Sequence, residues 1–118
     1  MRKLKFSVCG LFFLFGILAC ASSSQKGIVI ADSKKYEASL FRQNCAICHG
    51  SEGEGRTLDD GKIVPSLRKA EHKFNTREEI YRQITEGGNG MLPFRGSLSE
   101  RERQMLTDFV YRDLRGNQ

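Results

Sequence analysis

The chain has 118 residues, four cysteines and a formal net charge of +5, and 39% of its residues are hydrophobic. Three basic residues, Arg2, Lys3 and Lys5, lie in the first five positions, and without them 16 basic and 14 acidic residues leave a net charge of +2. The basic charge therefore gives no support to nucleic-acid binding, and the length allows one small domain after a leader.

The first 19 residues have the organisation of a secretory signal peptide. After the basic start, residues 6–19 are apolar apart from Ser7, Cys9 and two glycines, and the run ends at the small residue Ala19. A membrane-spanning helix needs about 20 apolar residues, so this run is short for one. We predict export with removal of residues 1–19, and an uncleaved N-terminal anchor is the alternative.

The end of this run, Ile17-Leu18-Ala19-Cys20, resembles the lipobox of bacterial lipoproteins. The resemblance implies that Cys20 becomes the first mature residue and carries lipid, on the periplasmic side of a bacterial membrane. Several acyl chains anchor a protein stably, whereas one gives marginal binding. Cleavage after Ala19 without lipid is the alternative.

Residues 20–32 are predicted to form a polar tether that includes Ser22-Ser23-Ser24. Ile28-Val29-Ile30 interrupts this polarity and could lie on the surface of the domain. We expect the domain to span residues 33–118 and to begin with a helix that Ser33 caps. The apolar face of this helix would carry Tyr36, Leu40 and Phe41.

The helix leads into Cys45-Ala46-Ile47-Cys48-His49, a C-x-x-C-H pattern. This is the pattern of covalent c-type haem attachment, in which two thiols reach the two vinyl groups at one porphyrin edge. The histidine that follows can then bind the iron from below. The motif predicts one covalent haem c held by Cys45 and Cys48, with His49 as an axial ligand.

Three other uses of a C-x-x-C pair fit the chain less well. Cys9 leaves with the leader and Cys20 is assigned to lipid, so no cysteine remains for a further disulfide. A zinc site needs about two more ligands, and His72 has no second ligand beside it. A thioredoxin-like site needs a preceding strand in a βαβ pattern, which the sequence does not show.

Two capping boxes mark two further helices. Thr76 and Glu79 open the first, with Ile80, Tyr81 and Ile84 on its apolar face and Gly87-Gly88 at its end. Ser99 and Glu102 open the second, whose stripe is Met105, Leu106, Phe109, Val110 and Leu114, before Gly116. No segment alternates with period two, so we predict an all-α fold of three main helices and long loops around the cofactor.

Met91 lies in an irregular loop between Gly87-Gly88-Asn89-Gly90 and Pro93. A thioether is a soft ligand, and histidine–methionine ligation raises the reduction potential of haem. We predict Met91 as the second axial ligand, and the alternative is an ordinary apolar residue of the loop. His72 is the competing ligand, but its charged surroundings favour an exposed histidine.

The chain resembles a small bacterial class I cytochrome c from about Tyr36 to Leu114. The likeness rests on the haem motif with Phe41 before it, on Val64-Pro65-Ser66-Leu67 and on Gly90-Met91-Leu92-Pro93-Phe94. It extends to the last helix, with Leu98, Ser99, Glu102 and Phe109-Val110-Tyr111. It implies the cytochrome c fold, Met91 as the distal ligand, and the Pro65 carbonyl as acceptor of the His49 Nδ1 proton. Glu37 stands where the family usually has glycine, so either Ala38 is the small helix contact or the helices cross more widely.

These features favour a one-electron carrier that exchanges electrons with redox proteins, binds no small-molecule substrate and is not an enzyme. An electron-entry subunit of a larger oxidoreductase is the first alternative. A catalytic or sensing haem protein, which needs an open distal site, is the second. The basic residues Lys62, Arg68, Lys69, Lys73 and Arg95 could steer an acidic partner to the haem edge or be only a solvated face.

Overall fold

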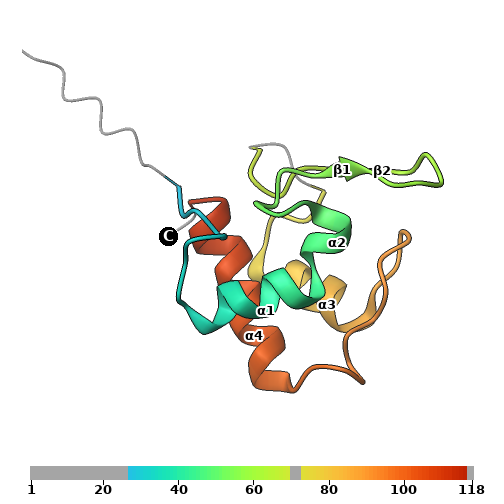
Figure 1. Ribbon diagram of the computed structural model, residues 1–118. Helices are drawn as coiled ribbons and strands as arrows, with labels where there is room; N and C mark the ends of the chain where they lie inside the picture. The colour runs from blue at the N-terminus through green and yellow to red at the C-terminus, as the bar shows by residue number, and fades with distance from the viewer. Residues whose placement is uncertain (1–26, 70–72, 117–118) are drawn as a thin grey trace, which may run out of the picture.

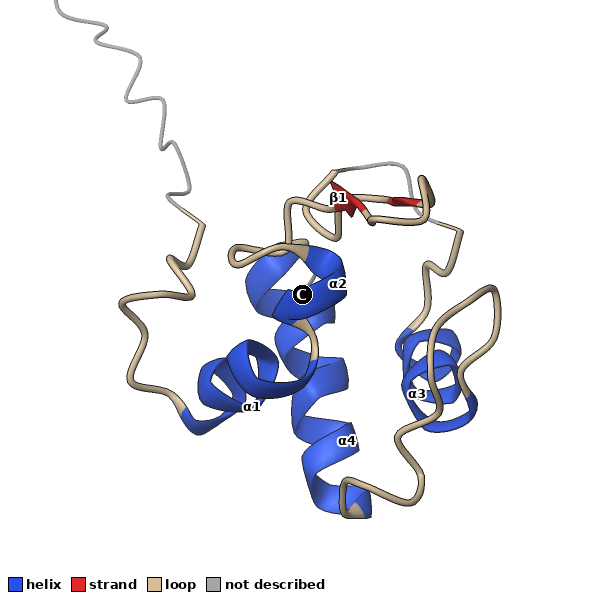
Figure 2. Ribbon diagram, turned by 45° about the vertical axis from the view of Figure 1, so that its right-hand side comes forward, coloured by secondary structure: helices blue, strands red, loops and turns tan. Residues whose placement is uncertain are grey.

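The structure is a computed structural model that describes residues 27–69 and 73–116. The predicted leader, Cys20, the first part of the tether and His72 lie outside the described residues. The described chain forms α1 (Tyr36–Asn44), α2 (Ala46–His49), β1 (Arg56–Thr57), β2 (Ile63–Val64), α3 (Arg77–Glu86), α4 (Glu100–Asp108) and the π-helix η1 (Phe109–Leu114). Figure 1 shows these elements in chain order, and in Figure 2 α4 lies between α1 and α3.

Helix α1 begins two residues later than predicted. Its N-cap is Lys35, which makes no capping hydrogen bond through its side chain. The hydroxyl of Ser33 accepts a hydrogen bond from the Lys35 N–H at 3.3 Å, outside the helix. Ser33 therefore holds a turn before the helix, and the predicted cap at Ser33 is wrong.

The two predicted capping boxes are confirmed. At Thr76 and at Ser99 the hydroxyl accepts a backbone hydrogen bond from the glutamate three residues on, and that glutamate accepts one in return. The last helix continues beyond Asp108 as η1, so the predicted helix is present but widens in its second half. Helix α3 ends at Gly87, whose φ of +70° favours glycine.

A two-stranded antiparallel hairpin follows α2 and was not predicted. Arg56 pairs with Val64 and Thr57 with Ile63, and the Leu58 N–H donates to the Lys62 carbonyl at 2.8 Å. Each strand has only two residues, which is too short for period-two alternation to appear in the sequence. The hairpin leaves the predominantly helical character of the fold unchanged.

The core lies where α1, α4 and η1 meet. Phe41 and Phe109 are buried, and their ring centroids are 6.0 Å apart at an interplanar angle of 56°, a tilted aromatic pair. Ala38 is also fully buried, while Glu37 is half-buried at the edge. Ala38 thus supplies the small buried position of α1 that the sequence left open. Tyr36, predicted on the apolar face, is 55% exposed and donates its hydroxyl hydrogen to Glu102 at 2.7 Å.

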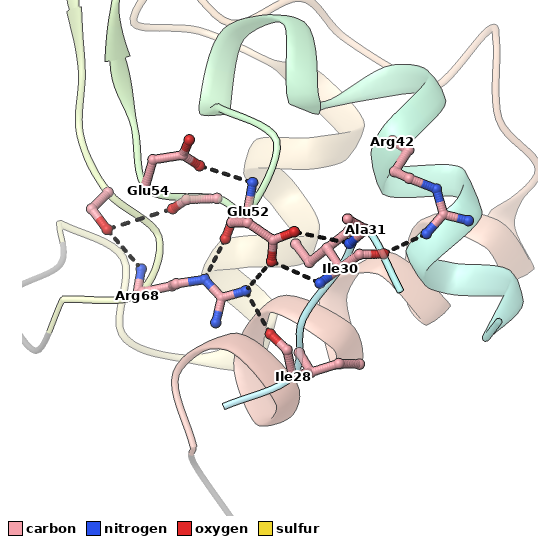
Figure 3. Close-up of polar contacts among 9 residues, drawn as sticks. Ile28, Ile30, Ala31, Arg42, Glu52, Glu54 and Arg68 are labelled. Carbon is pink, nitrogen blue, oxygen red and sulfur yellow. Dashed lines mark hydrogen bonds and ion pairs between the residues drawn. The ribbon is translucent and has the colours of Figure 1, made fainter. Parts of the chain in front are cut away.

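Residues 28–31 pack onto this core, although they precede the predicted start of the domain at residue 33. Ile30 is fully buried and Ile28 is partly buried against the core. The backbone of this segment is bound by Glu52, Arg68 and Arg42, as Figure 3 shows. The folded unit therefore includes the apolar residues that the sequence placed in the tether. Residues 28–31 are called the strap below.

Candidate functional site

Helix α2 places the motif residues on one turn of chain. Cys45 is the C-cap of α1 and the N-cap of α2. The His49 N–H donates to the Cys45 carbonyl at 2.9 Å. Residues three and four apart share one face of a helix, so Cys45, Cys48 and His49 lie on the same side of this turn. Both thiols are free, Cys45 half-buried and Cys48 exposed. This spacing is the one that attachment to two points at one edge of a planar group requires.

Burial favours the uncharged forms of Cys45 and His49. It raises the pKa of the Cys45 thiol to about 12, with a smaller contribution from Cys48, and it lowers the pKa of His49. A neutral imidazole is the form that binds a metal. The Nδ1 atom of His49 is buried and has no hydrogen-bond partner among the described residues. A buried polar atom without a hydrogen-bond partner destabilises a fold. An unpaired Nδ1 is consistent with an imidazole ring that takes its final orientation when the other nitrogen, Nε2, binds a metal.

The loop after the motif brings the segment of Pro65 next to His49. The Gly55 N–H donates to the His49 carbonyl at 2.7 Å. A Cβ atom on Gly55 would lie 2.5 Å from the Val64 carbonyl oxygen and 2.8 Å from the Pro65 carbonyl carbon. Only glycine permits this approach, and its φ of +81° favours glycine as well. The structure thus brings Pro65 close to His49 at the end of α2, without a hydrogen bond between the polar atoms of these two residues.

Met91 lies in a tight turn after α3. The Met91 N–H donates to the Gly88 carbonyl at 3.0 Å, and the Gly88 N–H donates to the Met91 carbonyl at 2.9 Å. A Cβ atom on Gly87 would lie 2.5 Å from the Met91 carbonyl oxygen, so this turn needs glycine there. The Met91 side chain is half-buried and packs against the core, whereas the next residue, Leu92, is 75% exposed. Met91 thus packs on the core from a loop in which its neighbour Leu92 is exposed.

Gln83 contacts this loop, although no sequence pattern predicts a role for this residue. Its side-chain amide donates to the Gly88 carbonyl at 2.9 Å and lies 3.7 Å from the Met91 sulfur. A glutamine on a helix carries no motif by itself. Gln83 reaches the methionine eight residues later only because the loop folds back onto α3.

The residues of the predicted basic cluster do not share one environment, and Lys69 is simply exposed. Arg68 is turned into the fold, where its guanidinium contacts Glu52 and the Ile28 carbonyl, so it is not free to steer a partner. Arg95 pairs with Glu86 at 3.1 Å on the surface. Lys62 and Lys73 instead border the methionine loop: Lys62 lies against Gly90, and Lys73 donates to the Asn89 side chain at 3.2 Å.

No group of three or more histidine, cysteine or acidic residues suited to a metal ion occurs within the described ranges. The zinc alternative therefore gains no support from the part of the chain that is described. A groove of about 530 Å³ lies between α3 and α4, lined by residues such as Arg77, Tyr81 and Arg103. None of the predicted site residues lines this groove. No helix in residues 27–69 or 73–116 is long and apolar enough to cross a membrane.

Known proteins share this arrangement. Residues 36–110 match the family described as cytochrome c oxidase, cbb3-type, subunit III. A cytochrome c6 from Gracilaria tenuistipitata var. liui is 27% identical over 100 residues, which cover 85% of this chain and 91% of that protein. A thiosulfate dehydrogenase from Psychrobacter arcticus is 37% identical over 67 residues, 53% of this chain but only 20% of the relative. The chain thus spans about a fifth of that enzyme's length.

A solved structure gives the same result for the fold. The KustC0563 c-type cytochrome superposes with a TM-score of 0.54 at 33% identity, over 62% of this chain and 90% of that one. This likeness confirms the predicted cytochrome c fold. Because the family match covers more than half of the residues, including the whole haem motif, the chain belongs to the cytochrome c family of electron-transfer proteins that carry covalently bound haem c.

Proposed function

We propose that this protein is an exported, membrane-tethered one-electron carrier whose haem is bound by Cys45 and Cys48 and ligated by His49 and Met91. The observation that carries the proposal is the pairing of two features. A C-x-x-C-H turn holds a histidine whose pKa is lowered by burial and whose Nδ1 has no hydrogen-bond partner among the described residues, and a methionine on a separate loop packs against the core. Bound haem supplies a reversible one-electron change at iron.

On the proximal side, the chain's own residues fix the ring that holds the iron. We assign the Pro65 carbonyl as the acceptor of the His49 Nδ1 proton, supported by the close approach of Gly55 to both residues. Such a bond fixes the tautomer and orientation of the imidazole and increases its basicity. Cys45 and Cys48 hold the same edge covalently, so the proximal ligand stays bound in both oxidation states.

Met91 would provide the second protein ligand to the iron. Its loop is oriented by the amide of Gln83 and by the paired bonds between Gly88 and Met91. With both positions occupied by protein ligands, no substrate reaches the metal, which favours a carrier over an enzyme.

We expect redox partners to dock on the face formed by α2, the hairpin and the methionine loop. Three large aliphatic side chains, Ile47, Ile63 and Leu92, are 74–77% exposed there. Arg56 on β1 donates to the Ile47 carbonyl at 3.2 Å and so links the hairpin to α2, and Lys62 against Gly90 links the hairpin to the methionine loop. An apolar centre bordered by basic side chains fits an acidic partner. Electron transfer to such a partner should slow as salt rises, and Lys62→Gln should reduce that dependence.

We further propose a lipid anchor at Cys20, supported by the lipobox-like Ile17-Leu18-Ala19-Cys20. The wild type should then remain with membranes after a high-salt wash, and Cys20→Ala should be released or stay unprocessed. The intact mass of the mature protein decides the matter. An unmodified N-terminus at or after Cys20 would exclude the anchor and leave the haem assignment untouched.

An electron-entry subunit of a larger oxidoreductase is the second candidate. It is supported by the family description, which names an oxidase subunit, and by the match to one fifth of a dehydrogenase. The chemistry of the haem would be the same, and only the partner would differ. Purification from detergent-solubilised membranes distinguishes the two, because a subunit leaves the column in a stable complex of fixed composition.

The test of the carrier function is carbon monoxide binding by the reduced protein at neutral pH. A six-coordinate haem with Met91 in place should bind carbon monoxide poorly, and Met91→Ala should bind it readily. Ready binding by the wild type, together with turnover of peroxide or nitrite, would show a catalytic or sensing haem instead.

A further inference from the structure

The strap, residues 28–31, lies outside the stretch that matches the family, which begins at Tyr36. It is nevertheless part of the folded unit, since Ile30 is fully buried and Ile28 packs on the core. The neighbouring Val29 is 45% exposed, so the segment presents alternate residues to the core and to solvent. A segment without helix or strand that lies on a domain needs partners for its backbone groups.

Glu52 supplies two of these partners. Its carboxylate accepts from the Ile30 N–H at 2.7 Å and from the Ala31 N–H at 2.9 Å, one oxygen for each donor. Hydrogen bonds to an ionised acceptor are stronger than bonds between neutral groups. The position of Glu52 is itself fixed, because its backbone N–H donates to the Glu54 carboxylate at 2.8 Å.

Two arginines bind the carbonyl groups of the same segment. Arg68 donates to the Ile28 carbonyl at 2.8 Å and also contacts the Glu52 carboxylate at 3.2 Å. Arg42 on α1 donates to the carbonyls of Ile30 and Ser33. Figure 3 shows that these side chains reach the strap from three different parts of the chain. The strap is therefore held by charged groups whose other contacts belong to the haem domain.

The strap lies on the side of the domain away from the methionine loop. In both Figure 1 and Figure 2 the residues before α1 run along one edge, and the loop between α3 and α4 lies at the opposite edge. At the start of the described chain, a Cβ atom on Gly27 would lie 3.2 Å from the Arg68 guanidinium. The chain thus enters the domain beside Arg68.

We infer that the strap sets the orientation of the tethered domain, turning the face with Ile63, Leu92 and Met91 away from the anchored end. This inference rests on the proposed tether at Cys20. It implies a partner whose redox centre stands clear of the membrane surface, a soluble or peripheral protein, in preference to one embedded in the bilayer. Release of residues 28–35 would lengthen the tether by up to about 28 Å and remove this orientation.

The first measurement is limited trypsin digestion of the full-length, haem-loaded protein. Cleavage after Lys34 or Lys35 should be about tenfold faster in Glu52→Gln than in the wild type. The glutamine side chain keeps one acceptor oxygen but places its NH₂ group, a donor, against one of the two backbone N–H groups that the Glu52 carboxylate binds. Glu86→Gln is the matched control, because it breaks the exposed Glu86–Arg95 pair on the other side of the domain. Equal cleavage in all three proteins would show that Glu52 does not dock the strap.

The second measurement is electron exchange of the same proteins in their membrane. Strap release should raise the rate with membrane-embedded oxidoreductases several-fold and leave the rate with soluble ferricyanide unchanged. An unchanged ratio of the two rates, with faster cleavage, would overturn the orienting role.

Arg42→Gln provides an independent variant from an exposed position on α1, since it removes the bond to the Ile30 carbonyl of the strap and the bond to the Ser33 carbonyl that follows it. Sulfur-to-iron charge transfer gives oxidised haem with a methionine ligand a weak far-red absorption band. This band should be the same in every variant. Its loss only in the strap variants would mean that the strap supports the haem ligands, which also contradicts the proposal. Its absence from the wild type would instead overturn the proposed ligation.

Discussion

The strap side and the methionine loop are built in opposite ways. On the strap side, charged side chains tie together segments far apart in the sequence, as Arg68 does with Ile28 and Glu52. The methionine loop is held mainly by bonds within itself and to α3, such as those of Gly88 with Met91 and of Phe94 with Ile84. It also contains four consecutive residues with positive φ, from Gly87 to Gly90.

The two proposed haem ligands also differ in their settings. His49, the proposed proximal ligand, is adjacent to the two cysteines that would attach haem permanently. Met91, the proposed distal ligand, is held by a few contacts in a largely exposed loop, and such segments open at lower free energy than a core does. The proximal side should therefore decide whether haem is attached, and the distal side should decide how easily an external ligand displaces Met91.

The largest expected effect comes from removing the attachment itself. Cys45→Ser combined with Cys48→Ser should abolish covalent haem, because no other thiol lies in the motif. Haem staining of a denaturing gel measures this, and Met91→Ala should keep full staining as the distal counterpart. Colour that stays with the polypeptide in the double variant would refute the assignment.

The next effect is on stability. Ile30→Ala should lower the free energy of unfolding by about 2–5 kcal/mol, since it removes a fully buried side chain. Val29→Ala is the control, because Val29 is 45% exposed and its loss should change stability by about 0.5 kcal/mol or less. Guanidinium titration of the haem-loaded proteins gives both values. Equal midpoints would show that the strap adds nothing to the core.

The smallest effect concerns the distal loop. Gln83→Leu should let imidazole displace Met91 about 2–10-fold more easily, the range expected for one lost hydrogen bond. Gln43→Leu is the matched control, since the Gln43 amide bonds only to the Ser39 hydroxyl on the surface of α1. Imidazole titration of the oxidised protein compares the three. The same affinity in wild type and Gln83→Leu would mean that Gln83 does not hold the loop.

Local chemistry made much of the fold predictable. Each capping box depends on two residues only three positions apart. The two thiols of the motif likewise have a fixed spacing. The helix stripes also located Phe41 and Phe109 in the core. In each case the signal and its effect lie within one or two turns of chain, where hydrogen-bond geometry leaves few alternatives.

The missed features all depend on contacts between distant segments. The sequence leaves open whether Ile28-Val29-Ile30 lies on the domain, because Glu52, which accepts from the Ile30 N–H, is 22 residues away in the chain. For the same reason the sequence groups Arg68 with residues that either steer a partner or form a solvated face, and it indicates no role for Gln83. Ser33 was misplaced because a serine hydroxyl can serve a turn as readily as a helix cap. The run Ile28-Val29-Ile30 was the one visible sign that the tether ends early.

The far-red absorption of the oxidised protein tests the central claim most directly, because sulfur-to-iron charge transfer requires methionine on ferric haem. The wild type should show this weak band at neutral pH, Met91→Ala should lose it, and His72→Ala should keep it. A band that survives Met91→Ala, or disappears in His72→Ala, would contradict ligation by His49 and Met91.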